Sequence, residues 1–326
     1  MNIYSNVVEL LAPAGDYNCF IAAINAGADA VYVGGSKYGA RAYATNFSDD
    51  ELIDAINICN ILGKKLYLTL NTLMKDYELE DLIEYIKPFY EAGLNGVIVQ
   101  DLGVVKAISE HYKDLPIHGS TQMAITDVEG ACYLKELGIN RVVPARELSL
   151  DEIKVISKKA DIEIESFIHG ALCYSFSGKC LFSSLIGGRS GNRGRCAQPC
   201  RLPYNNEYIL SAKDICTLDI IPKLIDAGIK SFKIEGRMKS KEYVATVTGL
   251  YRKYIDQYLS NPKHEYIVLK NDKDEIVYEY ALANAKIISS SIEKTYLKSG
   301  EGCLSVPTAH EGYVNRSARI KVRKKD

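Results

Sequence analysis

Residues Ala26–Val31 read AGADAV, in which a helix-like segment ends at a glycine and an apolar, strand-like run follows directly. The same design recurs as EAGLNGV at Glu91–Val97, ELGINRV at Glu136–Val142 and DAGIKSF at Asp226–Phe232. Glycine is common just past the end of a helix, because it adopts the left-handed conformation without a Cβ penalty. Each copy therefore predicts a helix that ends and a strand that starts, the repeating unit of a parallel β-sheet.

Short apolar, β-branched runs alternate with segments of helical period along most of the chain. The runs are Val8–Pro13, Ala30–Gly34, Lys65–Asn71, Gly96–Gln100, Ile117–Gln122, Arg141–Ala145, Ile162–Ile168 and Ser231–Glu235. Between them, Ser48–Glu51 and Ser149–Glu152 have the pattern of helix capping boxes. Eight strand–helix units predict an α/β fold, a (β/α)8 TIM-like barrel, with a doubly wound open sheet as the alternative.

The connection after the seventh strand is much longer than a strand–helix connection needs, and it predicts a Cys-rich insertion over residues 170–208. Long loops at this end of a barrel usually carry function. After residue 263 the sequence shows short strand-like runs and no helical period. The expected domains are therefore a barrel over residues 1–263 and a short β-rich tail over residues 264–326.

Polar side chains stand at the ends of several expected strands, where a barrel carries its active site. Gln122 is the last residue of the fifth run, His169 closes the seventh strand, Glu235 ends the eighth run and Arg237 lies two residues further on. Each of them alone could also be a helix cap or a strand-end hydrogen-bonding group, and His169 is either a structural histidine or a proton donor. The catalytic candidates are His169, Glu235 and Glu165, and the substrate-binding candidates here are Gln122 and Arg237.

Four of the nine cysteines fall within the Gly-rich insertion, at Cys173, Cys180, Cys196 and Cys200. In a reduced compartment such clustering points to a metal site before disulfides. Zinc and an iron–sulfur cluster would both fit, although structural zinc usually takes tighter CxxC pairs. Four other cysteines lie in helical or apolar context and are expected to be packing residues, namely Cys19, Cys59, Cys132 and Cys216.

Arginines surround these cysteines. The stretch between Gly187 and Leu202 has no acidic residue and contains Arg189, Arg193 and Arg195, with Arg201 at its end. This local positive patch suits phosphate or carboxylate groups, and a solvated basic loop is the alternative. Arg193, Arg195 and Arg201 are therefore further substrate-binding candidates.

The overall composition sets limits on function. The chain has 326 residues, of which 47% are hydrophobic, and a net charge of -1. Such a chain can bury a large core but has no global positive field to attract nucleic acid. The first residues lack the pattern of a signal peptide and no apolar run is long enough for a membrane span, so a cytoplasmic location without membrane contact is expected. GxSxG, HExxH, Walker and GxGxxG motifs are absent from the sequence.

Several motifs resemble one known family. ELLAPAG at Glu9–Gly15, GADAVYVGG at Gly27–Gly35, STQM at Ser120–Met123 and above all ESFIHGALCYSFSGKCLFSS at Glu165–Ser184 are similar to the collagenase-like peptidases, numbered thirty-two among peptidases of unknown type. The resemblance covers about residues 8–262.

The resemblance implies oxygen-independent hydroxylation of a tRNA or rRNA base, with RNA as the partner and prephenate as the hydroxyl source. It also implies a 4Fe-4S cluster on Cys173, Cys180, Cys196 and Cys200. Two alternatives remain: a collagenase-like peptidase, as the family name states, and a non-catalytic iron–sulfur protein.

The end of the chain carries a second resemblance. Residues Ala283–Val322 are similar to the middle of a peptide deformylase, whose EGCLS motif supplies a metal-binding cysteine, here Cys303. The HExxH motif with the two His ligands and the catalytic Glu is absent. Deformylase activity is therefore not expected.

Overall fold

The computed structural model describes residues 8–41, 44–205, 207–285, 301–304 and 318–321. The strands of its main sheet are β1 (Glu9–Pro13), β2 (Ala30–Val33), β3 (Lys65–Leu70), β4 (Gly96–Val99), β5 (Ile117–Gly119), β6 (Arg141–Val142), β7 (Glu163–Gly170), β8 (Ile215–Cys216) and β9 (Ser231–Ile234). Every run expected from the sequence overlaps one of the eight parallel strands, with β7 extending two residues past its run, and β8 is an addition.

These strands close on themselves. Neighbours follow the order β6-β5-β4-β3-β2-β1-β9-β7, and β6 also pairs with β7. All these pairings are parallel. The expected (β/α)8 barrel is therefore confirmed, and the open-sheet alternative is wrong.

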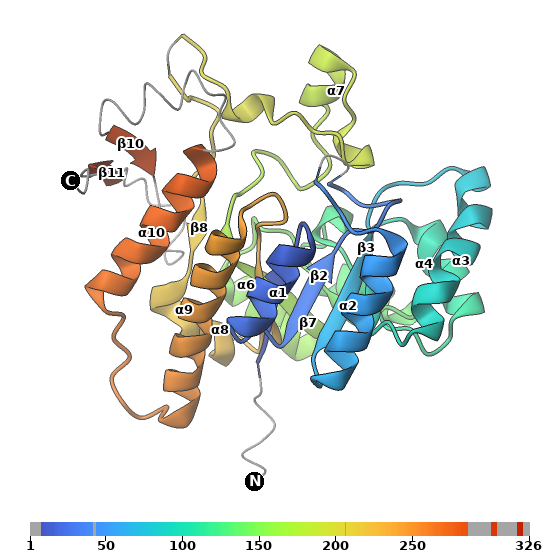
Figure 1. Ribbon diagram of the computed structural model, residues 1–326, viewed down its shortest axis with the longest axis horizontal. Helices are drawn as coiled ribbons and strands as arrows, with labels where there is room; N and C mark the ends of the chain where they lie inside the picture. The colour runs from blue at the N-terminus through green and yellow to red at the C-terminus, as the bar shows by residue number, and fades with distance from the viewer. Residues whose placement is uncertain (1–7, 42–43, 206, 286–300, 305–317, 322–326) are drawn as a thin grey trace.

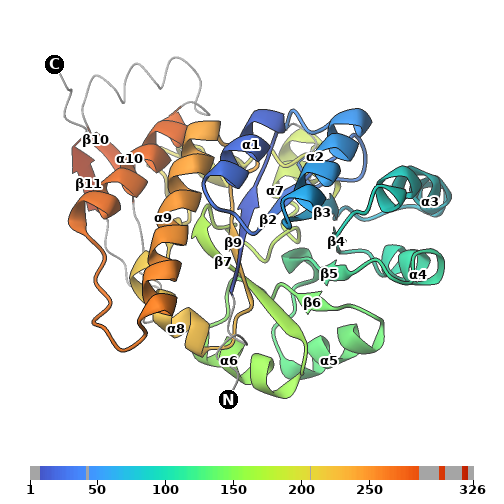
Figure 2. The same cartoon turned by 60° about the horizontal axis from the view of Figure 1, so that its bottom comes forward.

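Helices surround the barrel, as Figures 1 and 2 show from two directions. They are α1 (Tyr17–Asn25), α2 (Asp49–Ile61), α3 (Asp76–Glu91), α4 (Leu102–His111), α5 (Val128–Glu136), α6 (Leu150–Lys159), α8 (Ile221–Asp226) and α9 (Lys241–Ser260). Both expected capping boxes form. The side chains of Ser48 and Ser149 each accept a hydrogen bond from the backbone N–H of the glutamate three residues further on, and the carboxylate of that glutamate accepts one from the backbone N–H of the serine.

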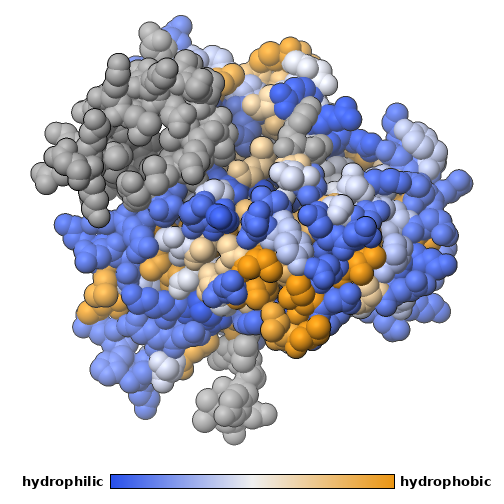
Figure 3. Space-filling view, viewed as in Figure 1, coloured by the Kyte–Doolittle hydropathy of each residue, from blue (hydrophilic) through white to orange (hydrophobic). Residues whose placement is uncertain are grey.

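The insertion leaves and re-enters the barrel at one place. It starts at the end of β7, and the chain that follows it returns to the barrel at β8, which pairs antiparallel with that same end, His169 opposite Cys216. Between these points lie α7 (Phe182–Gly187) and the short turns η3 (Gly191–Arg193) and η4 (Pro199–Arg201). Helix α7 projects at the top of the molecule (Figure 1), where part of the surface is hydrophobic (Figure 3). Its Leu185 and Ile186 are exposed. The insertion therefore stands over the mouth of the barrel.

The segment after residue 263 differs in part from the expectation. It begins with a helix, α10 (Lys270–Ala285), where the sequence analysis expected only strand-like runs. Asp272 of this helix bonds to Lys253 and Tyr254 of α9, and Ile276 is buried, so this segment packs on the barrel. Strands β10 (Glu301–Leu304) and β11 (Ala318–Lys321) then form an antiparallel pair.

The expected boundary near residue 263 stays a prediction. Most of the deformylase-like segment, Ala283–Val322, lies outside the described residues. Among the residues that the structure does describe, no helix has both the length and the apolar character that crossing a bilayer requires.

Candidate active site

A pocket of about 330 Å³ lies at the C-terminal ends of the barrel strands, beneath the insertion. Barrel residues form its floor and walls, including Tyr32 of β2, Thr69 of β3, Phe167 of β7 and Lys233 of β9. The insertion contributes the rest of the lining, including the four expected ligand cysteines. The structure therefore brings strand ends and the insertion together around one space.

The four cysteines Cys173, Cys180, Cys196 and Cys200 are free thiols that all line this pocket. The sulfur of Cys180 accepts a hydrogen bond from the backbone N–H of Phe182 at 3.4 Å. The sulfur of Cys196 accepts one from Gln198 at 3.3 Å. Both sulfurs are therefore held by the backbone of the insertion itself.

The metal-binding side chains near the pocket limit the kind of metal centre that could form there. Within the described ranges, no three His, Cys, Asp or Glu side chains stand close enough to hold a single metal ion. A 4Fe-4S cluster makes a different demand, because each of its four irons takes one thiolate. The four cysteines fit that demand in number and in chemical type.

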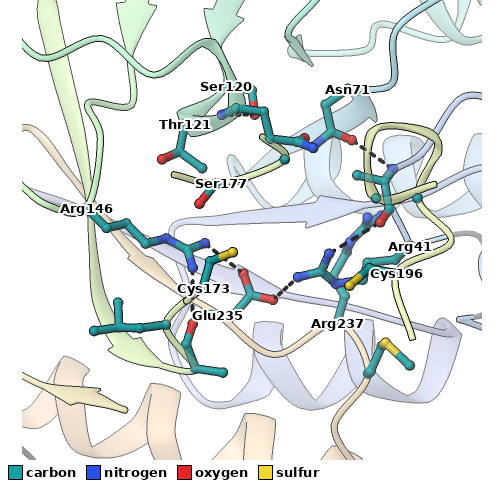
Figure 4. A pocket seen from close by; sticks show the side chains of 18 of the residues that line it. Arg41, Asn71, Ser120, Thr121, Arg146, Cys173, Ser177, Cys196, Glu235 and Arg237 are labelled. Atoms are coloured by element: carbon teal, nitrogen blue, oxygen red, sulfur yellow. Dashed lines mark hydrogen bonds and ion pairs between the residues drawn. The ribbon is translucent and has the colours of Figure 1, made fainter. Parts of the chain in front are cut away.

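Glu235 lies at the centre of an arginine-rich wall (Figure 4). Arg41 donates to its Oε1 at 2.9 Å, and Arg146 contacts its Oε2 at 3.5 Å. Burial raises the carboxyl pKa, but the charges of Arg41, Arg146 and Arg237 outweigh it and lower that pKa to about 2. Glu235 is therefore an anion that orients arginines, and a general acid would need a raised pKa instead.

Arg237 is also buried in this wall. Its Nη1 donates to Thr69 Oγ1 at 2.8 Å, and burial followed by the charge of Arg41 lowers its pKa to about 10. The lowered pKa still leaves the guanidinium charged near neutral pH. The basic side chains that line the pocket are Arg41, Arg146, Arg189, Arg201, Arg237 and Lys233, against the single acidic side chain Glu235 in the same lining. The excess of positive charge in this lining favours an anionic ligand.

Glu165 lies below the pocket, inside the barrel, and is fully buried. Its carboxylate accepts from Lys233 Nζ at 2.6 Å and from Arg141 at 3.3 Å. Lys233 in turn lies 4.4 Å from the centre of the Tyr32 ring and lines the pocket floor. Glu165 therefore holds Lys233 in place and does not line the pocket itself.

His169 points away from the pocket. Alternation along β7 predicts that Glu165, Phe167 and His169 share one face, but the pairing with β9 shifts its register between Phe167 and His169. The ring of His169 consequently packs against Tyr243 and Tyr251 of α9, with Nδ1 at 3.4 Å from the Tyr251 hydroxyl. The catalytic role expected for His169 has no geometric support.

Acid should destabilise the protein through His169. Burial, and then the charge of Lys239, lower the pKa of its imidazole from 6.5 to about 3, so the folded protein keeps it neutral while the unfolded chain protonates it below pH 6.5. Stability should therefore fall as the pH falls below 6.5. Urea midpoints between pH 8 and pH 5 measure this, and His169→Gln should flatten the slope below pH 6.5. An unchanged slope in the variant would contradict this placement.

The three arginines expected to bind substrate, Arg193, Arg195 and Arg201, fall into two groups. Arg193 pairs with Glu78 of α3 and donates to the carbonyl of Leu73, and Arg201 pairs with Asp214 at 3.0 Å. These two arginines fasten the insertion. Arg195 is exposed, and its carbonyl accepts from Arg189 at 3.1 Å. Gln122, as expected, lines the pocket, next to Thr121 and with its backbone N–H bonded to Ser120.

Three basic residues of the barrel that line the pocket were not among the candidates from the sequence, namely Arg41, Arg146 and Lys233. Arg146 stands at a strand end, and Lys233 is a lone cation within an apolar strand, so both carry a signal that could have marked them. Arg41 lies in the connection after β2 and carries no such signal. Its role depends on a contact with Glu235, far away in the sequence.

Comparison with known proteins gives consistent results. The model of peptidase family U32 matches residues 15–301, past residue 262 where the sequence resemblance was expected to end. The tRNA hydroxylation protein P1 of Bacillus subtilis is 38% identical over 285 residues, which are 82% of this chain and 67% of that protein. The 23S rRNA 5-hydroxycytidine synthase of Escherichia coli is 42% identical over 270 residues, but they are only 40% of its length and 78% of this chain.

A collagenase of Porphyromonas gingivalis is 36% identical over 81% of this chain and 69% of its own length. The solved structure of a U32 peptidase matches 71% of this chain and 93% of its own, with a TM-score of 0.52 and 13% identity. That likeness supports the barrel fold. The extent of the family match and the identity to these relatives show that the chain belongs to peptidase family U32.

Proposed function

We propose that this chain hydroxylates a base of tRNA or rRNA without using molecular oxygen. The relatives named for tRNA hydroxylation and for 5-hydroxycytidine synthesis support this class of reaction. The observation that carries it is the shared pocket, onto which four cysteines and the arginine wall both open. A peptidase needs neither feature.

Cys173, Cys180, Cys196 and Cys200 would hold a 4Fe-4S cluster beside the substrate. Such a cluster, when bound, would supply single-electron transfer. The number and chemical type of these four free thiols in one pocket support this assignment. The chain's own part is to keep these thiolates next to the arginine wall.

The arginine wall would take a small carboxylate co-substrate, of which prephenate is our candidate. Prephenate carries two carboxylates, and planar guanidinium groups suit carboxylates because they donate two parallel hydrogen bonds. Arg41, Arg146 and Arg237 are buried or partly buried and already oriented by Glu235 and Thr69. Binding an anion there needs little rearrangement of side chains.

The collagenase among the relatives makes proteolysis the second candidate. A cysteine peptidase needs a histidine beside its thiol to act as the base. In the described part of the chain no histidine lines the pocket, and His169 and His118 are both buried elsewhere. The geometry therefore favours the hydroxylase.

The test uses protein purified without oxygen and incubated with unmodified tRNA and rRNA, with and without prephenate. Nucleosides are then analysed by mass spectrometry, and cleavage of gelatin is measured in parallel. We expect a hydroxylated nucleoside that depends on prephenate, and no gelatin cleavage. Cleavage without hydroxylation would support the peptidase, and neither product, with iron present, would support a non-catalytic iron–sulfur protein.

A further inference from the structure

The amide of Gln122 is buried at the pocket without a complete set of hydrogen bonds. Gln122 belongs to the turn η2 (Thr121–Met123) that follows β5, and only 8% of it is exposed. Its Oε1 is buried and has no hydrogen-bond partner among the described residues. An unsatisfied buried acceptor costs about 1–3 kcal/mol, so its presence in a pocket points to a ligand that donates to it.

One contact holds the turn that carries Gln122, and another restricts its side-chain amide. The backbone N–H of Gln122 donates to Ser120 Oγ at 3.2 Å, which holds the turn. From above, Gly178 of the insertion passes so closely that a Cβ there would lie 2.8 Å from Gln122 Nε2. Gly178 also has a φ of +76°, which favours glycine. The glycine thus allows the insertion to close over the amide.

The wall around Gln122 is neutral, in contrast to the arginine wall across the pocket. Ser120, Thr121, Asn71 and Ser177 lie on this side, and Arg41, Arg146, Glu235 and Arg237 lie on the other (Figure 4). Thr121 Oγ1 already donates to the carbonyl of Pro144 at 3.2 Å, and Asn71 Oδ1 already accepts from the N–H of Ala40 at 2.9 Å. The ligand of this wall should therefore be uncharged and should offer its donor to Gln122.

A carboxamide presents one acceptor and one donor side by side, which matches the Watson–Crick edge of a pyrimidine. Its oxygen accepts from the cytosine N4 amino group while its nitrogen donates to N3. At uracil, its oxygen accepts from N3–H and its nitrogen donates to O4. This edge is free for such pairing only when the base has left its stack and entered the pocket. The two walls would then hold the base and the small acid at once, on opposite sides.

We propose that Gln122 recognises the Watson–Crick edge of the target pyrimidine, flipped out of the RNA into the neutral side of the pocket. The inference rests on the proposed function. It assigns the base to one wall and leaves the arginine wall to the anion.

Gln122→Met keeps the length of the side chain and removes both hydrogen-bonding groups. We expect its kcat/KM for RNA to fall about ten- to a hundredfold, as loss of a bidentate base contact does, while the KM for prephenate and the iron content stay at wild-type values. Gly178→Ala should lower kcat/KM for RNA in the same way by displacing the amide. The matched control is Gly188→Ala, in the same insertion, where φ is also positive, +64°, but a Cβ would meet nothing within 4 Å.

The outcomes separate the two proposals. Wild-type turnover of RNA by Gln122→Met would overturn the role of Gln122 and leave the proposed function intact. A rise in the KM for prephenate equal to the loss on RNA would place the acid at Gln122, and would also overturn it. If the wild-type protein hydroxylates no RNA while its iron is present, the proposed function itself fails.

Discussion

Serine in place of Cys173, Cys180, Cys196 or Cys200 is expected to remove most of the iron from the protein. Each substitution takes away one of four thiolates, and the hydroxyl that replaces it is a poor ligand for iron. All four variants should lose iron together, because all four thiols line one pocket. Iron per chain and visible absorbance after purification without oxygen measure the effect.

Cys132→Ser is the matched control for these variants. Cys132 is a free, half-buried thiol on α5 that does not line the pocket. Its replacement should leave the iron content unchanged. Full iron retention in the four pocket variants would refute the cluster assignment, and iron loss in Cys132→Ser would show that the assay reports general damage.

Glu165→Gln should cause the largest loss of stability among single substitutions at charged residues near the site. The carboxylate of Glu165 is fully buried and binds both Lys233, at 2.6 Å, and Arg141. Its neutralisation leaves the Lys233 ammonium buried without this partner, which typically costs about 3–5 kcal/mol. The urea midpoint of unfolding should fall accordingly.

Two comparisons test the cause of that loss. Asp81→Asn breaks an ion pair with Lys37 in which both side chains are about half exposed, 47% and 52%, and it should barely change the urea midpoint. The double variant Glu165→Gln with Lys233→Met should recover part of the stability, because the buried charge is then gone. If the double variant is less stable than Glu165→Gln alone, charge burial is not the cause.

The sequence predicts the barrel because its strands and helices differ in local period and the helices end in recurring glycines. Those signals are local, and the eight parallel strands follow from them. The helix Lys270–Ala285 was missed because its apolar positions form only a weak stripe, although the segment is rich in helix-forming residues.

The site residues that lie close together in the sequence could be predicted, and those that only folding brings together could not. The four cysteines lie in one segment, so their common pocket could be expected from spacing alone. Arg41 meets Glu235 only after the barrel closes, since 194 positions separate them in the chain. The sequence left a structural role and a proton-donor role open for His169, because a register shift within one strand cannot be read from residue types.

The pairing of β8 with the end of β7 affects how this protein can evolve. His169 opposite Cys216 and Gly170 opposite Ile215 hold the two ends of the insertion side by side, as the base of a hairpin does. For a loop with fixed ends the entropic cost of extra length grows slowly, by roughly 0.6 kcal/mol per doubling. Residues could therefore be added, removed or exchanged above this junction with little effect on the barrel below, and new chemistry could be grafted onto the same scaffold.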